Sequence, residues 1–317
     1  MPGPILVLGE ALIDEVHRQG DVAQHPGGSP MNVAVGLARL DNDVHLLSQW
    51  GGDADGDRIE QHLTSSGVVI VPGTRSTNPT SRAIATIDET GAANYEFHVT
   101  WDPQSSATLD GVSHAHTGSI STVITPGANK VAEMIESLAS SATVSVDPNA
   151  RPSLMGDPAE AYERISRIIA NADIVKASDE DIAWLTKDTD ERDVVEQWLA
   201  GGAAIVVVTR GADGVSAYCA AGEVSSPTLA TEVADTVGAG DSLMGGLIDG
   251  LNRLGLLGAA NRDALNDVSL IDLTEVITWA SAISAITVSR DGANPPTTAE
   301  VRTFLSEHDI STQFADR

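Results

Sequence analysis

The chain has 317 residues and a mass of 32.9 kDa, and 42% of its residues are hydrophobic. This length and composition suit two ordinary domains or one large α/β unit and exclude a disordered or collagen-like chain. The 45 acidic and 18 basic residues leave a net charge of −27, which disfavours nucleic acid and membrane partners and which we attribute to solubility or salt adaptation. Cys219 is the only cysteine, so an intrachain disulfide is excluded. We find neither a signal peptide nor a membrane-spanning segment, and we expect a cytoplasmic protein.

The predicted elements alternate between buried strands and helices. Short, continuous apolar runs predict buried strands at 5–8, 143–146, 174–175 and 205–208. Helical patterns cover 32–40, 58–65, 129–138, 158–171, 180–185, 194–200, 241–254 and 273–288. This alternation predicts a parallel sheet that is covered by helices on both faces.

Two β-hairpins interrupt the α/β pattern. Polar and apolar residues interleave in 81–101 around the turn Asp88-Glu89-Thr90-Gly91, and a second pair of strands flanks Gly20 in 14–25. We expect both hairpins to project from a single domain, 1–317, as a lid over a site. The segment 256–272 is interpreted as a loop-like insertion.

Several common motifs are absent or incomplete. No lysine follows a glycine, so there is no Walker A loop, and the turn at 238–240 lacks the third glycine of GxGxxG. The acidic run 53–57 imitates a calcium loop but has Arg58 in place of glycine, so a structural turn is the better interpretation. His114 and His116 have no third zinc ligand at a recognisable spacing, so we favour packing for them.

The most informative stretch is residues 235–242, DTVGAGDS. A Gly-Ala-Gly turn that opens a helix leaves backbone N–H groups unpaired at the positive end of the helix dipole, which makes an anion site without a lysine. Asp241 beside this turn could accept a proton from an attacking hydroxyl, so the stretch predicts a phosphoryl-transfer centre. An aspartate that only caps the helix is the simpler alternative.

A second glycine pair leads into another helix. Gly27 and Gly28 allow close approach of the backbone to a ligand, and Asn32 supplies both a donor and an acceptor for a polyhydroxylated substrate. Asp14 adds a carboxylate that can accept two sugar hydroxyls. The run DPNAR at 147–151 follows a buried strand, where α/β sheets place ligand groups, although a plain turn is an equal alternative.

Taken in order, these motifs resemble the ribokinase family of sugar kinases, also called the phosphofructokinase B type. The resemblance spans Ile5 to about Pro295 and rests on GEALID at 9–14, Gly27-Gly28 with Asn32, GGD at 51–53 with Gly56, TRG at 209–211 with Gly214, and DTVGAGD at 235–241. It implies an α/β sandwich with a mainly parallel central sheet flanked by helices and a small β-sheet lid. It also implies ATP as the phosphoryl donor, with Mg²⁺ bridging its phosphates.

The resemblance assigns roles to individual positions. Asp241 matches the catalytic base, and the anion hole matches Gly238, Ala239 and Gly240. Sugar binding is assigned to Asp14, Gly27, Gly28, Asn32 and Asp241, with Trp101 and Arg151 as further candidates. Nucleotide binding is assigned to Ser178, Thr209, Arg210, Gly211, Gly214, Gly240 and Ser281.

Metal ions enter the same comparison. The family motif Asn-x-x-Glu, associated with Mg²⁺ and phosphate handling, is Ser178-Asp179-Glu180-Asp181 here, so Asp181 is expected to act on Mg²⁺ through water. Some members bind a monovalent cation such as K⁺ through backbone oxygens, and the matching positions are Asp235, Val237, Thr287, Arg290 and Gly292. This chain has Pro296 where relatives place a further serine.

The motifs GEALID, GGSPMNVA at 27–34, and TSRA at 80–83 leading to NYEF at 94–97 look like the fructokinase branch. The segment 95–101 offers no arginine to a sugar acid, and Glu96 would repel a carboxylate, so a neutral sugar, fructose, is favoured. Trp101 would be an apolar wall or ordinary packing. A 2-keto-3-deoxygluconate kinase selected by Arg151, a ribokinase, and a catalytically silent sugar-sensing regulator remain alternatives. A homodimer formed through the lid is a further hypothesis.

Overall fold

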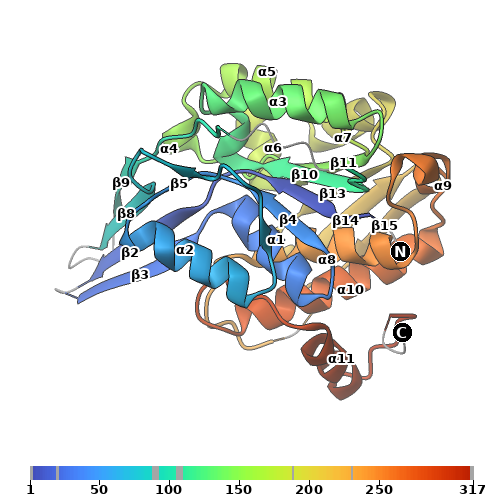
Figure 1. The fold of residues 1–317 in the computed structure, drawn as a ribbon. Helices are drawn as coiled ribbons and strands as arrows, with labels where there is room; N and C mark the ends of the chain where they lie inside the picture. Colours follow the sequence, from blue (N-terminus) through green and yellow to red (C-terminus); the bar gives the residue numbers. More distant parts are fainter. Residues whose placement is uncertain are drawn as a thin grey trace.

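A nine-stranded sheet crosses the computed structural model, which describes residues 3–314 except 19–20, 88–92, 105–109, 188, 230 and the side chains of 93–94 (Figure 1). In sheet order its strands are β15 (Gly222–Ser226), β14 (Val215–Cys219), β13 (Ile205–Thr209), β12 (Ile174–Ser178), β11 (Thr143–Asp147), β10 (His114–Gly118), β1 (Ile5–Leu8), β4 (Val44–Leu47) and β6 (Val69–Ile70). The strands from β13 to β6 pair in parallel, while β14 and β15 are antiparallel. The predicted, mainly parallel sheet is confirmed.

The strands that the apolar runs predicted are β1, β11, β12 and β13, but the pattern missed the others. β10 escaped because its side chains are polar, although all five of its residues are buried. His114 bonds to the hydroxyls of Thr143 and Ser145, so the strand buries imidazoles whose hydrogen bonds are supplied by its neighbour β11. A search for apolar runs cannot find a strand of this kind.

Helices cover both faces of the sheet, as Figure 1 shows. One face carries α1 (Ser29–Arg39), α2 (Ala54–Ser65), α8 (Ala239–Arg253) and α10 (Leu270–Val288), with α11 (Thr298–Glu307) outside them. The other carries α3 (Gly127–Leu138), α4 (Pro152–Met155), α5 (Pro158–Ile169), α6 (Asp179–Thr186) and α7 (Glu191–Ala200). Side chains alternate along β1, so Ile5 and Val7 enter the first core and Leu6 and Leu8 the second.

The interpretation of 256–272 as a loop was wrong in part. This segment contains a short helix, α9 (Arg262–Asn266), and its Leu265 side chain is fully buried in the first core. Arg262 donates to Asp173 at 2.5 Å, and also to the backbone oxygens of Ala139 and Ala142. The predicted pattern failed here because a helix of one turn is too short to express a period.

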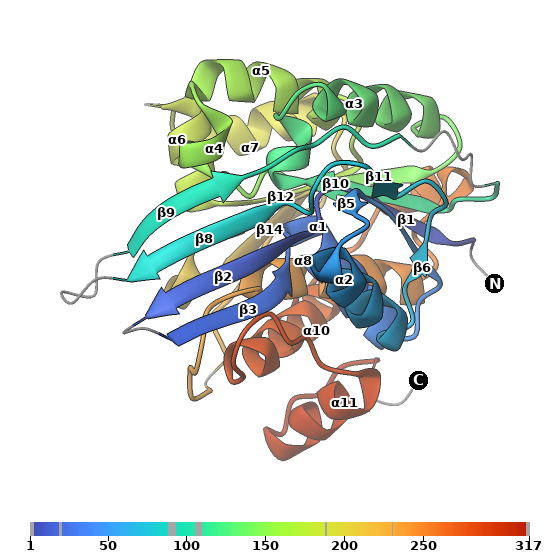
Figure 2. The same cartoon turned by 60° about the vertical axis from the view of Figure 1, so that its left-hand side comes forward.

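A four-stranded sheet, which we call the lid sheet, projects from one end of the main sheet (Figure 2). Its order is β3 (Asp21–Gly27), β2 (Leu12–Arg18), β8 (Arg82–Ile87) and β9 (Ala93–His98). The hairpins β2–β3 and β8–β9 match the two predicted ones, and β2 joins them by pairing in parallel with β8. Gly20 and the turn Asp88-Glu89-Thr90-Gly91 lie outside the described residues.

The lid sheet is tied to the main body by charge and by a minor sheet. Arg82 on β8 forms ion pairs with Asp55 on α2, at 2.5 Å, and with Glu15 on β2, at 3.0 Å. Both carboxylates are buried, which screens the pairs from solvent. Nearby, β5 (Trp50–Gly51) pairs with β7 (Arg75–Ser76). These contacts fix the end of the lid sheet that lies next to α2.

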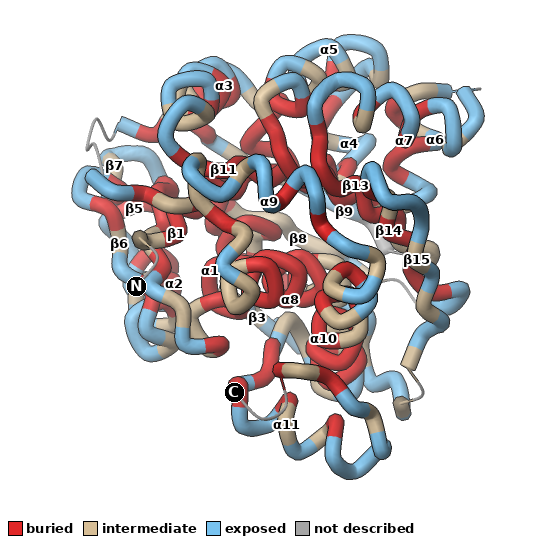
Figure 3. The backbone as a smooth tube through the Cα atoms, turned by 90° about the vertical axis from the view of Figure 1, so that its right-hand side faces the viewer, coloured by how far each residue is buried: buried red, intermediate tan, exposed pale blue. Residues whose placement is uncertain are grey.

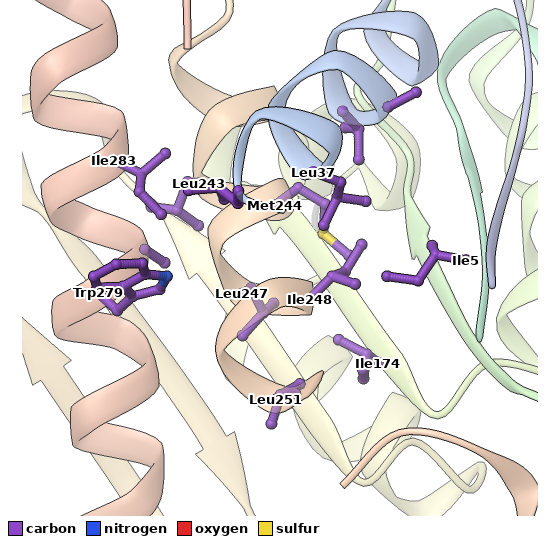
Figure 4. Close-up of a cluster of buried hydrophobic side chains, with 14 of the residues drawn as sticks. Ile5, Leu37, Ile174, Leu243, Met244, Leu247, Ile248, Leu251, Trp279 and Ile283 are labelled. Carbon is purple, nitrogen blue, oxygen red and sulfur yellow. The ribbon is translucent and has the colours of Figure 1, made fainter. Parts of the chain in front are cut away.

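Close packing of α8 against α10 and α1 builds the centre of the first core (Figures 3 and 4). Met244, Leu247 and Leu251 of α8 are fully buried in it. α10 is long and apolar enough to cross a membrane by length and composition, with a mean hydropathy of 1.3 over 18 residues. In this fold 56% of that window is buried inside the protein.

The two adjacent glycines of α8 give a matched test of this packing. A Cβ on Gly246 would lie 2.7 Å from the Ala280 Cα of α10, whereas a Cβ on Gly245 would meet nothing closer than 3.7 Å. Gly246→Ala should therefore lower the free energy of unfolding by about 2 kcal/mol through overpacking. Gly245→Ala should leave it unchanged or raise it by up to about 1 kcal/mol through helix propensity. Urea unfolding measures both, and equal effects would contradict this account of the helix contact.

Candidate functional site

The candidate site lies where the carboxyl ends of the central strands meet the first turn of α8 and the base of the lid sheet. Asp147 ends β11 and Ser178 ends β12, while Glu10 follows β1. Asp14 lies on β2 of the lid sheet. In open α/β sheets, ligands bind outside the carboxyl ends of the strands, so the fold collects polar side chains where a ligand is expected.

Three side chains hold the carboxylate of Asp241, which is buried in the first turn of α8. Oδ1 accepts hydrogen bonds from Ser29 Oγ at 2.7 Å and from Asn149 Nδ2 at 3.3 Å. Oδ2 accepts one from Asn32 Nδ2 at 2.8 Å. The donors come from α1 and from the loop after β11, so the orientation of this acceptor depends on parts of the chain far apart in sequence.

The Gly-Ala-Gly turn precedes Asp241 directly. Gly238 has a φ of 76°, and a Cβ there would lie 2.7 Å from the Ala293 Cβ, so glycine is required on both counts. The turn opens α8, whose first N–H groups have no partners within the helix. A Cβ on Gly240 would lie 3.5 Å from Lys176 Nζ. The expectation of an anion site without a lysine did not foresee this group, because β12 brings an ammonium beside the turn.

Lys176 and Asp147 form a buried ion pair under this turn. The distance from Lys176 Nζ to Asp147 Oδ2 is 2.8 Å. Burial raises the pKa of Asp147 to about 6, although the positive charge of Lys176 opposes that shift. Burial works against the charged form of Lys176, but the surrounding carboxylates, Asp147 foremost, outweigh it and raise the pKa of Lys176. Both groups are therefore charged at neutral pH.

Asp14 and Glu10 are two further buried carboxyl groups, of which Asp14 is close enough to Asp241 to feel its charge. Asp14 lies over Gly27, where an added Cβ would be 1.9 Å from Asp14 Oδ2. Burial raises the pKa of Asp14 to about 6, and the negative charge of Asp241 adds to the shift while Arg151 opposes it. Burial likewise raises the pKa of Glu10, to about 7, although Glu10 accepts a hydrogen bond from the Ser121 amide at 3.2 Å.

The other predicted sugar positions have different surroundings. Gly28 has a φ of 114°, and a Cβ there would lie 2.6 Å from the Glu10 backbone oxygen, so this turn also requires glycine. Arg151 is exposed, and its Nη1 donates to the Ala150 backbone oxygen at 3.0 Å. The Trp101 ring is only 2% exposed, and its Nε1 donates to the Ser121 backbone oxygen at 3.0 Å. Trp101 packs in the second core of the main body, whereas the packing alternative had placed it within the lid.

Most residues that were predicted to bind the nucleotide lie near the ends of β12 and β13. Ser178 and Thr209 are direct partners across these strands. The side chain of Arg210 is engaged by Glu191 and by Ser216 Oγ, and Gly214 has a φ of 94° in the turn that follows. On α10, the buried Ser281 Oγ has no hydrogen-bond partner among the described residues.

The predicted cation positions lie in the loop before α8, in the last turn of α10 and in the loop after α10. Asp235 Oδ1 accepts from the Val237 amide at 3.0 Å, and Oδ2 accepts from the Gly292 amide at 2.9 Å. Thr287 is fully buried and bonded to Ser242 Oγ at 2.8 Å, while Arg290 pairs with Glu300 at 2.6 Å. Asp235 thus joins the loop before α8 to the loop after α10.

Asp181, which was predicted to act on Mg²⁺ through water, has a structural role in this fold. Its Oδ2 accepts from the Ser178 amide at 2.9 Å, closing a capping box, and its Oδ1 accepts from the Ala150 amide at 2.7 Å. No group of three or more His, Cys, Asp or Glu side chains that could hold a metal ion is found in the described part of the chain. Mg²⁺ is commonly held by one or two carboxylates together with phosphates and water. The single carboxylate of Asp181 fits that mode of binding.

The motifs that were set aside have structural explanations. Asp53 caps α2 by accepting from the Gly56 amide at 2.9 Å, and it also accepts from Thr80, as expected for a turn. His114 and His116 bond to hydroxyls of β11.

Two residues of the site were not singled out from the sequence, Ser29 and Lys176, whereas Asp147 and Asn149 lie in the run 147–151 that was. Ser29 carries no signal of its own, because it matters only through its contact with Asp241. Lys176 did carry one, since it interrupts the apolar strand Ile174–Ser178, and a lysine in a strand buried on both faces needs a partner. Asp147, at the end of the neighbouring strand, is that partner.

Asp181→Asn tests the capping role. The amide nitrogen of asparagine cannot accept from a backbone N–H, so this variant should lose about 1–2 kcal/mol of unfolding free energy. Asp179→Asn is a matched control, because Asp179 is exposed in the same turn, and it should change stability by less than about 0.5 kcal/mol. Equal unfolding midpoints in urea for the two variants would rule out the cap.

Known proteins resemble this chain in sequence and in fold. The family model described as pfkB family carbohydrate kinase matches residues 6–300. A fructokinase of Rhizobium leguminosarum bv. trifolii is 31% identical over 278 residues, covering 84% of this chain and 85% of the relative. The crystal structure of fructokinase with bound ATP from Xylella fastidiosa has a TM-score of 0.86 at 28% identity, covering 98% of this chain and 100% of that one.

A third relative is the structure of fructokinase from Vibrio cholerae O395 in fructose, ADP and calcium ion bound form. It has a TM-score of 0.77 at 25% identity and covers 96% of this chain and 99% of that one. The family match spans most of the chain, and the structural likeness includes the lid sheet and the central sheet together. The chain belongs to the pfkB family of carbohydrate kinases.

Proposed function

We propose that this sugar kinase is a fructokinase, which transfers the γ-phosphate of ATP to a primary hydroxyl of fructose with Asp241 as the general base. The observation that carries the proposal is the position of the Asp241 carboxylate, held by Ser29 and Asn32 at the N-terminus of α8, directly after the Gly-Ala-Gly turn. The similar proteins support the choice of sugar, since those reported above are fructokinases.

The proposed chemistry needs no covalent intermediate. Asp241 accepts the proton of the primary hydroxyl while the sugar oxygen bonds to the γ-phosphorus and the bond to the β–γ bridging oxygen breaks, which releases ADP. The amides of Gly238, Ala239 and Gly240 stabilise the negative charge of the transferred group. Asp14, Gly28 and Asn32 bind the sugar, and Gly27 gives the Asp14 carboxylate the space it occupies.

ATP would lie along the ends of β12 and β13, against Ser178, Thr209 and the turn that contains Gly211 and Gly214. The buried Oγ of Ser281, which has no hydrogen-bond partner among the described residues, is available to the adenine ring of ATP. Bound Mg²⁺ neutralises phosphate charge, and Asp181 would hold it through water. A monovalent cation would bind backbone oxygens of the two loops joined by Asp235.

Two further parts of the proposal concern the whole molecule. A homodimer would form through the lid sheet, where Val22 and Tyr95 are exposed large side chains. The protein would act in the cytoplasm.

The function is tested by ADP release with ATP, Mg²⁺ and K⁺. The acceptors are fructose, ribose, 2-keto-3-deoxygluconate and adenosine, with a control that contains no sugar. The proposal expects a strong preference for fructose. Preference for the keto acid would reassign the substrate and make Arg151 the selective residue. Saturable sugar binding without ADP release would identify a silent regulator instead.

Asp241→Asn should lower kcat by about 10²–10⁴-fold, because an amide cannot accept the proton. Its dissociation constant for fructose should change little, since Asn32 and Asp14 remain. Steady-state kinetics and calorimetry measure the two effects separately. Near-full turnover in this variant would remove Asp241 from the role of base.

Sugar binding should weaken in mild acid. The pKa of Asp14 is raised to about 6, and only the ionised carboxylate accepts two hydroxyl hydrogen bonds. The KM for fructose should therefore rise about tenfold for each pH unit below about 6. Asp14→Asn should have a high KM that does not vary between pH 5 and 7. A slope that persists in this variant would point to Glu10, whose pKa is about 7, in place of Asp14.

A further inference from the structure

The side chain of Lys176 occupies a place that fold stability alone does not explain. It extends from β12 toward the first turn of α8, and the residue is only 3% exposed. Its Nζ lies 2.8 Å from Asp147 Oδ2 and next to Gly240, where an added Cβ would be 3.5 Å away. The ammonium group therefore lies beside the proposed anion turn.

An ammonium group has three N–H donors, and Lys176 Nζ forms an ion pair with Asp147 Oδ2. Both carboxylate oxygens of Asp147 nevertheless have no hydrogen-bond partner among the described residues, so this ion pair does not use up a donor of Nζ. The neighbouring carboxylates of Asp181 and Asp241 contribute further negative charge without accepting a hydrogen bond from it. Lys176 thus keeps donor capacity free on the side of Gly240.

A buried ion pair contributes little net stability, because the cost of removing both charges from water is comparable to their attraction. If the Lys176–Asp147 pair only stabilised the fold, apolar side chains could replace it. If it serves a ligand, it adds a positive charge at the N-terminus of α8, where a transferred phosphoryl group carries its negative charge. The position beside Gly240 favours the second explanation.

We propose that Lys176 is a catalytic residue that donates to the γ-phosphoryl group of ATP from below the Gly-Ala-Gly turn, with Asp147 as its positioning residue. This inference rests on the proposed function, since it uses the same phosphoryl site. It adds a cation to a site that was expected to act through backbone amides alone. A consequence is preference for ATP over ADP, because ADP lacks the group that Lys176 contacts.

The low lysine content of the chain makes a direct test practical. Lys130, Lys176 and Lys187 are the only lysines, so protein labelled with ¹³C at the lysine ε-carbon gives three signals, which Lys130→Arg and Lys187→Arg assign. With Mg²⁺ and fructose, the non-hydrolysable β,γ-imido analogue of ATP should shift the Lys176 signal strongly. ADP should shift it little, and the Lys130 and Lys187 signals should stay in place. Equal responses to the two nucleotides at Lys176 would overturn the proposal.

Variants test the same contact through affinity and rate. Lys176→Met with Asp147→Asn removes both charges and leaves no unpaired buried carboxylate. This double variant should lose about 10²–10³-fold in kcat and at least tenfold in the ratio of ATP to ADP affinity. Its fructose affinity should change less than twofold. Lys130→Met with Asp102→Asn removes a partly exposed Lys–Asp pair of the same kind, at 2.6 Å, and should leave all three quantities unchanged.

The outcomes separate this inference from the proposed function. If the Lys176 double variant retains kcat and the ATP to ADP ratio, Lys176 only neutralises Asp147 and the inference is wrong. If the double variant does not fold, the ¹³C signals of the lysines in the wild-type protein still test whether Lys176 contacts the γ-phosphoryl group. If the wild-type protein phosphorylates no sugar, the proposed function fails, while the nucleotide-dependent shift of Lys176 still tests the phosphate contact.

Discussion

The site depends on the contact between α8 and α10. Gly246 lets the two helices approach so closely that no side chain fits between them at that point. Two hydrogen bonds then join α10 to the first turn of α8, from Ser284 Oγ to the Ala239 backbone oxygen at 3.0 Å and from Thr287 Oγ1 to Ser242 Oγ at 2.8 Å. The first turn of α8, which presents backbone amides, is thereby held by α10, a helix that is buried over most of its length. The position of this turn is therefore fixed by the packing of the core. Preorganised donors of this kind do not have to be reoriented during a reaction.

The sheet face beneath α8 changes from apolar to polar along its strands. β12 begins with Ile174, which is fully buried in the first core, and then carries Lys176 and Ser178 on the same face. On β11 the same face carries Thr143, Ser145 and Asp147, and the hydroxyls of Thr143 and Ser145 bond to the histidines of β10. Because side chains alternate between the two faces of a strand, a row of polar groups runs along this face and ends under the Gly-Ala-Gly turn. The pairing is incomplete, since His116 Nε2 and both carboxylate oxygens of Asp147 have no hydrogen-bond partner among the described residues, and the ion pair with Lys176 offsets the charge of Asp147.

How much the sequence could predict varies with the range of the interaction. The runs of β1 and β13 and the Gly-Ala-Gly turn are local patterns, and both lid hairpins also followed from alternation. β10 did not, because its buried imidazoles are acceptable only beside the hydroxyls of β11. Trp101 belongs to a segment that resembles a lid, yet its indole enters the second core and bonds to Ser121. Lys176 and Gly240 lie side by side although they are 64 positions apart, so only the folded chain places a cation at a turn that local sequence presents as purely backbone.

Asp14 belongs to the lid sheet and Asp241 to the main body, and this division bears on what can happen at the site before a sugar binds. Asp14 lies on β2, which is paired with both hairpins of the lid sheet, whereas Asp241 belongs to the rigid packing of α8. A sugar held by both would be a bridge between these two bodies, and its arrival would set their separation. Without that bridge, a water molecule at the phosphoryl site would meet Asp241 alone and would gain nothing from Asp14. In the proposed fructokinase, dividing the acceptor site in this way would discourage hydrolysis of the nucleotide while no sugar is bound.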